Sequence, residues 1–176
     1  HDPWQSVGIE RASVGGQISE ECDPIFVVVQ TPHEPQYEGA TPLPETRADF
    51  DYSYLYKVLL SLELARTEAT VAVVSTVLPG TWRERFPGFH YVYNPSFCAM
   101  GTVGDDFLDP EFVLLGHEGD PGCLPEFYDS FPLPAPILET DITTAEGIKM
   151  VYNSFVTAKV TLANYYGELA ERLGMD

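Results

Sequence analysis

The chain has little positive charge: only 9 of its 176 residues are Lys or Arg, against 27 Asp and Glu, which gives a net charge of −18. Such an acidic protein repels phosphate backbones and anionic lipid headgroups, so nucleic acids and membranes are not expected partners. Long apolar runs are also missing, since the longest covers residues 25–29 and a bilayer span needs roughly 20 apolar residues. The first residues lack the basic and apolar segments of a signal peptide, so none is expected.

Cysteine and histidine are scarce. The three cysteines, Cys22, Cys98 and Cys123, form an odd set without a CxxC pair, so we expect no disulfide framework and a reducing, cytoplasmic location. The four histidines stand apart from one another without the spacing that zinc ligands require, so no metal site is expected.

Short β-branched, apolar segments alternate with helical patterns along most of the chain. Strands are predicted at residues 25–30, 70–75, 90–93, 111–116 and 135–138, and helices at about 51–64, after Pro79-Gly80-Thr81, and at 120–131. Nearly continuous apolar strands between helices are typical of a parallel sheet that is covered on both faces. The predicted fold class is therefore α/β, a partial doubly wound, Rossmann-like parallel sheet followed by a long C-terminal helix.

The long helix is predicted from Thr143 to just before Gly174, about 30 residues. Apolar residues recur there every three or four positions, at 148, 151, 155, 158, 162, 165, 169 and 173. A stripe of that length needs an apolar partner, so we expect a homodimer through residues 143–173. The pattern change divides the chain into residues 1–141 and 142–176.

Polar or turn residues follow three of the predicted strands, as Thr31-Pro32, Ser75-Thr76 and Asn94-Pro95-Ser96. Ligands of such sheets bind beyond the carboxyl ends of the strands, so these residues are candidates for one site. Turn residues follow any strand, however, and on spacing alone both interpretations remain open.

Read in order, these segments resemble the UDP-glucose/GDP-mannose 6-dehydrogenase family. The resemblance rests on IFVVVQTP at residues 25–32, STVLPGT at 75–81, NPSF at 94–97 and EGIKMVYN at 146–153. A weaker alternative is another dehydrogenase of the wider β-hydroxyacid type, but the STVLPGT and NPSF spacing favours the sugar-nucleotide branch.

The resemblance implies oxidation of the 6-hydroxyl of a nucleotide sugar to a carboxylate, with NAD as cofactor, in polysaccharide biosynthesis. It implies three groups of site residues, which are catalytic Thr76, Lys149 and Asn153; cofactor-binding Thr31, Pro32, Ser75 and Thr76; and substrate-binding Ser96, Phe97, Cys98, Lys149 and Asn153. We therefore expect Thr76 and Lys149 to face one shared pocket.

The departures from the family pattern predict an inactive isolated chain. The GxGxxG turn that holds a dinucleotide pyrophosphate is not found, nor is the family's Gly-Gly-x-Cys segment with its nucleophilic cysteine. Ser96 stands where the family has a glutamate, and a hydroxyl does not ionise near pH 7, so it is no general base for hydrolysis. The alternative is a catalytically inactive remnant that acts as a dimerising or binding module.

Overall fold

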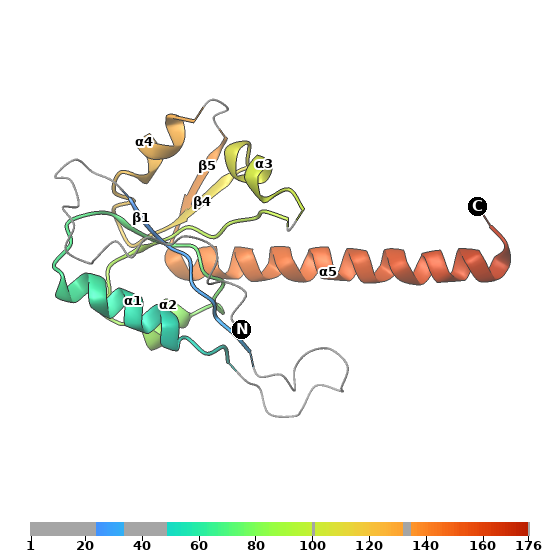
Figure 1. Ribbon diagram of the computed structural model, residues 1–176, viewed down its shortest axis with the longest axis horizontal. Coiled ribbons are helices and arrows are strands. Elements are labelled where there is room, and N and C mark those ends of the chain that lie inside the picture. The colour runs from blue at the N-terminus through green and yellow to red at the C-terminus, as the bar shows by residue number, and fades with distance from the viewer. Residues whose placement is uncertain (1–23, 34–48, 100, 132–134, 176) are drawn as a thin grey trace, which may run out of the picture.

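The computed structural model describes residues 24–33, 49–99, 101–131 and 135–175, in which strands and helices alternate (Figure 1). In chain order the elements are β1 (Ile25–Val27), α1 (Ser53–Leu64), β2 (Val71–Val73), α2 (Thr81–Arg85), β3 (Val92–Tyr93), α3 (Val103–Leu108), β4 (Val113–Gly116), α4 (Leu124–Asp129), β5 (Ile137–Thr140) and α5 (Ile142–Leu173). Each predicted strand is confirmed; the first four are shorter than predicted, and β5 has the predicted length but begins two residues later than predicted.

The five strands form one sheet in the order β1-β2-β3-β4-β5. Three of the neighbouring pairs are parallel, which confirms a mostly parallel α/β sheet of the Rossmann-like kind. The sheet differs from a fully parallel one at β3 and β4, which are antiparallel with Tyr93 opposite Gly116. The chain does not cross back between these two strands, so β4 begins at the edge of the sheet where β3 ends.

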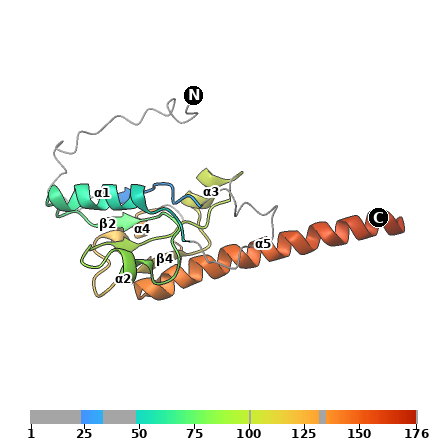
Figure 2. The same cartoon turned by 90° about the horizontal axis from the view of Figure 1, so that it is seen from below.

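Helices cover both faces of the sheet, with α1, α2 and the start of α5 on one face and α4 on the other (Figures 1 and 2). The side chains of β2 alternate accordingly: Val71 and Val73 pack with Leu55 of α1, whereas Ala72 packs with Leu124 of α4. This two-sided burial explains why the strands read as continuous apolar runs.

The long helix is confirmed, but it begins one residue before the predicted Thr143. The N-cap is Asp141, whose carboxylate accepts from the Thr144 amide at 2.9 Å and from the Thr144 hydroxyl at 2.6 Å. Gly174 ends the helix in the left-handed conformation, with φ 66°. Only its first turns contact the sheet, and the rest extends away from the body (Figures 1 and 2). None of the described helices is long and apolar enough to cross a membrane.

The short helix α3 was not predicted. None of its six residues is buried, so the sequence has no apolar period to indicate it. Side-chain hydrogen bonds hold its start instead, because the Asp106 carboxylate accepts from the Ala99 amide and from the Thr102 hydroxyl, both at 2.7 Å.

The contact between β4 and α5 requires a glycine. A Cβ added to Gly116 would lie 2.5 Å from the Cβ of Ala145 and 3.1 Å from the Cα of Ile142. We expect Gly116→Ala to lower the free energy of unfolding by about 1–3 kcal/mol, because the helix must move away from the sheet. Urea denaturation measures this change.

The matched control is Gly147→Ala on α5, two residues after Ala145, where an added Cβ meets nothing within 4 Å. This variant should raise the free energy of unfolding by up to about 1 kcal/mol through helix propensity. Equal effects of the two alanines would contradict the proposed packing limit.

Candidate functional site

The carboxyl ends of β1 and β2 are tied together by hydroxyl side chains. The Ser75 hydroxyl donates to the Val29 carbonyl at 2.7 Å and accepts from the Val29 amide at 2.9 Å. The Thr31 hydroxyl donates to the Thr76 carbonyl at 2.7 Å. Pro32 lies at the same end, where its carbonyl accepts from the Asp51 amide at 2.8 Å. The structure thus brings together the four residues that were predicted to bind the cofactor.

The end of β3 lies beside this edge and is fixed by Asn94. The Asn94 amide donates to the Val73 carbonyl at 2.8 Å, and its side chain donates to the Leu114 carbonyl at 3.1 Å. The Tyr128 hydroxyl completes the junction by donating to the Asn94 side chain at 2.6 Å, and burial raises the pKa of Tyr128 to about 12. These bonds set the direction of the chain into Ser96.

Lys149 of α5 reaches this strand-end loop. Its ammonium donates to the Ser96 carbonyl at 2.6 Å and lies 4.9 Å from the centre of the Phe97 ring. The lysine is only 8% exposed, and burial lowers its pKa from the ordinary 10.5. Within the described ranges, no carboxylate lies at salt-bridge distance from it. A buried ammonium with a neutral acceptor and further N–H donors is suited to stabilising a negatively charged oxygen.

Asn153 lies one helical turn beyond Lys149 and is half-buried. Its neighbour Tyr152 packs against Phe97 with ring centres 4.8 Å apart, and Phe97 packs against Phe112 at 4.6 Å. These aromatic contacts fix the strand-end loop against the face of α5 that carries Lys149 and Asn153.

The Ser96 hydroxyl is used inside the loop, where it donates to the Cys98 thiol at 2.8 Å and accepts from the Cys98 amide at 3.3 Å. Both side chains are half-buried. The Cys98 thiol is therefore engaged within this local turn.

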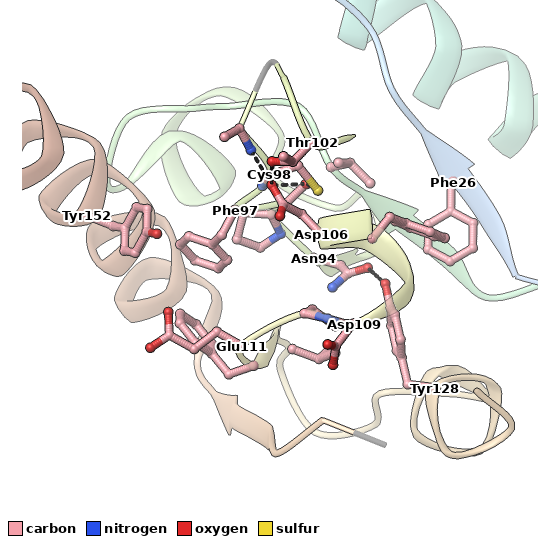
Figure 3. Close-up of a pocket in the computed structure, with 18 residues that line it drawn as sticks. Phe26, Asn94, Phe97, Cys98, Thr102, Asp106, Asp109, Glu111, Tyr128 and Tyr152 are labelled. Atoms are coloured by element: carbon pink, nitrogen blue, oxygen red, sulfur yellow. Dashed lines mark hydrogen bonds between the residues drawn. The ribbon is translucent and has the colours of Figure 1, made fainter. Parts of the chain in front are cut away.

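A cavity of about 480 Å³ opens beside this loop (Figure 3). Ser96, Phe97 and Cys98 line it, together with the carboxylates of Asp106, Asp109 and Glu111 and several aromatic rings. No Lys or Arg is among the described residues that line it. Thr76, Lys149 and Asn153 do not line it either, so the expected pocket shared by Thr76 and Lys149 is not this cavity and stays a prediction.

Sequence reasoning did not single out Glu146, which it placed only at the start of a helix. Its carboxylate is fully buried and accepts from the Gly80 amide at 2.6 Å and from the Trp82 amide at 2.9 Å. The available signal was its place three residues before Lys149, on the same face of the helix.

The chain is similar to known dehydrogenases in sequence and in fold. No protein-family model matches the chain. A UDP-glucose 6-dehydrogenase of Haloferax volcanii is 34% identical over 78% of this chain and 33% of that protein. A crystal structure of a ternary complex of GDP-mannose dehydrogenase from Pseudomonas aeruginosa matches with 30% identity and a TM-score of 0.71, over 88% of this chain and 37% of that one. A UDP-glucose dehydrogenase structure from Pyrobaculum islandicum matches with 29% identity and a TM-score of 0.67, over 88% and 36%.

The chain is a Rossmann-type dehydrogenase in its fold. It has the mostly parallel sheet with three adjoining strand ends, followed by the helix that carries Lys149. Within that class, the chain belongs to the UDP-glucose/GDP-mannose 6-dehydrogenase family. It spans about a third of the length of the relatives that it matches.

Proposed function

We propose that this chain is part of an NAD-dependent nucleotide-sugar 6-dehydrogenase, which oxidises the 6-hydroxyl of the sugar to a carboxylate, as in UDP-glucose to UDP-glucuronate. The observation that carries the proposal is Lys149, a buried ammonium held on the Ser96 carbonyl without a carboxylate partner among the described residues. The names of the relatives support the nucleotide sugar as substrate class.

The roles of the catalytic residues follow from their chemistry. Lys149 donates to the sugar oxygen as negative charge develops on it during oxidation, and again to the oxyanion formed before hydrolysis. Asn153, one turn away, holds a sugar hydroxyl through its amide. Thr76 orients the water that releases the acid. Ser96, Phe97 and Cys98 form the wall along which the substrate lies.

Bound NAD would supply the oxidant, and because the change from a primary hydroxyl to a carboxylate removes four electrons, two hydrides would leave the sugar carbon, one to each of two NAD molecules in turn. Thr31, Pro32, Ser75 and Thr76 would lie along the bound NAD, and they fit this role as one continuous edge. The hydroxyls of Thr31 and Ser75 are engaged between the strands, so these two residues shape the edge. A glycine-rich phosphate loop is not found among the described residues, so we assign only part of the dinucleotide to this edge.

The proposal also covers the domains of the chain, its assembly and its location. We assign residues 1–141 to the NAD-binding domain and residues 142–176 to the start of a central domain that forms a homodimer through α5. The location is the cytoplasm, and the product serves polysaccharide biosynthesis.

A second candidate function is a non-catalytic, dimerising module. The observation that favours it is the exposed apolar stripe of α5, on which Val151 is 69% and Phe155 is 63% exposed. This function needs the helix but no ligand at the strand ends, so ligand binding distinguishes it from the dehydrogenase.

Amide shift mapping tests the proposed function. We expect UDP-glucose or GDP-mannose, added at millimolar concentration to the ¹⁵N-labelled chain, to shift the amide signals of Ser96, Phe97 and Asn153. Residues 1–176, purified and supplied with NAD, should form no NADH, measured by absorbance, because the glycine-rich turn that binds the pyrophosphate is not found in this sequence. Shifts confined to the far part of α5, or no shifts at all, would favour the dimerising module.

A further inference from the structure

Glu146 is a buried carboxylate that the proposed reaction does not use. Its side chain has no exposed surface, and its two oxygens accept from two different backbone amides, Oε2 from Gly80 at 2.6 Å and Oε1 from Trp82 at 2.9 Å. Gly80 is the N-cap of α2 and Trp82 lies in the first turn of that helix, so Glu146 holds the start of α2, where the segment that follows β2 and contains Thr76 ends. The contact joins α5 to this turn across more than 60 residues of sequence.

The surroundings of the Glu146 carboxylate oppose its ionisation. Burial raises the pKa of Glu146, and this effect outweighs the amide donors and the positive charge of Arg83, which lower it. Tyr91, just before β3, and Tyr93 of β3 are nearby acids whose pKa values are raised by burial and by the charge of Glu146. No described Lys or Arg forms an ion pair with it. The two backbone amides are therefore the groups that hold this buried carboxylate in place.

The first turns of α5 connect two segments that follow neighbouring strands of the sheet. Glu146 holds the turn that follows β2, and Lys149, three residues later on the same face, holds the Ser96 carbonyl of the loop that follows β3. Gly80 has φ 91°, a conformation that disfavours other residues, so the turn presents its amides to Glu146 in a shape set by glycine. The Tyr52 hydroxyl supports the same turn from α1, because it accepts from the Leu78 amide at 3.3 Å.

We propose that Glu146 is a positioning residue, whose carboxylate fastens the turn that follows β2 to α5 and so sets Thr76 in place relative to Lys149. The meaning of that placement rests on the proposed function, because Thr76 and Lys149 act on the same substrate there. The hydrogen bonds of Glu146 to Gly80 and Trp82 need no ligand, so they can be tested whether or not a nucleotide sugar binds.

The experiment is a pH titration of the ¹⁵N-labelled full chain followed by amide chemical shifts, with hydrogen exchange measured at neutral pH. In the wild type, we expect the Gly80, Trp82 and Thr76 amides to share one titration whose midpoint lies above the ordinary glutamate value of 4.5. In Glu146→Gln that titration disappears, because a side-chain amide does not ionise in this pH range, and one of the two backbone amides loses its acceptor, because glutamine has one acceptor oxygen in place of two. Exchange protection of Gly80 or Trp82 falls about tenfold, while that of Val73 in β2 stays unchanged.

The matched control is Glu84→Gln, since the Glu84 carboxylate is the other acid beside this turn, with Oε1 3.7 Å from a Cβ built on Gly80. The control must retain the shared titration. The proposal is overturned if the titration persists in Glu146→Gln, if it disappears in Glu84→Gln, or if Thr76 does not follow Gly80 and Trp82. Should Glu146→Gln not fold, the wild type and Glu84→Gln decide by the same criteria.

Discussion

Replacing Lys149 by methionine is expected to lower kcat on the order of 10²–10³-fold in a complete enzyme, the usual effect of removing one donor to a developing oxyanion. The assay needs the parts that the relatives have beyond the matched region. A chimaera supplies them, in which residues 24–175 replace the matching part of the Pseudomonas aeruginosa GDP-mannose dehydrogenase. Methionine keeps most of the length and packing of the lysine side chain, so the loss reports on the charge and its N–H donors. NADH formation is measured by absorbance.

The pH dependence of the activity provides a second test of the role of Lys149. Burial lowers the pKa of Lys149 from the ordinary 10.5, and activity needs the protonated form. Activity should therefore fall as pH rises through the lowered pKa, which places the alkaline limb below 10.5, and this limb should disappear in the methionine variant. Lys159→Met, on the same helix, is the control and should leave kcat unchanged. An alkaline limb that survives in Lys149→Met would assign it to another group.

The sequence predicted the parts of the fold that depend on burial. The strands at residues 71–73 and 113–116 pack against helices on both faces, so their apolar runs were visible without coordinates. The helix α5 was predicted in type and length, because its apolar spacing and Gly174 are local signals. The catalytic role of Lys149 was predicted from the resemblance of its motif and stays a prediction. The structure adds that its ammonium donates to the Ser96 carbonyl.

The parts that were missed depend on contacts between distant residues. The direction of β4 is set by how the chain passes from Tyr93 to Gly116, and its apolar pattern is the same in either direction. The hydrogen bonds of Glu146 come from two amides more than 60 residues earlier, which no local pattern indicates. A glutamate near the start of a helix looks like any other favourable charge there, and only the three-dimensional contact distinguishes it.

Replacing Leu162 by glutamate is expected to raise the dissociation constant of the proposed homodimer by about ten- to a hundredfold. Leu162 is 54% exposed in a single chain and lies on the stripe with Phe155 and Leu169, beyond the part of α5 that contacts the sheet. Fully burying a leucine contributes about 1.5–3 kcal/mol, and about half of the Leu162 side chain remains to be buried, so a twofold dimer that buries it twice loses about 1.5–3 kcal/mol in total. A glutamate must also lose water at the interface, which adds to the loss.

Sedimentation velocity over a concentration series measures the change, and Asn164→Glu provides the comparison. Asn164 is also exposed, two residues away, and helical geometry places it about 160° around the axis from Leu162. The two variants carry the same new charge on the same helix, so a dimer built on the stripe should weaken only in Leu162→Glu. Equal weakening by both would mean that net charge opposes association, since each protomer already carries −18 and an added acid increases the repulsion. Unchanged association in Leu162→Glu would place the interface elsewhere on the chain.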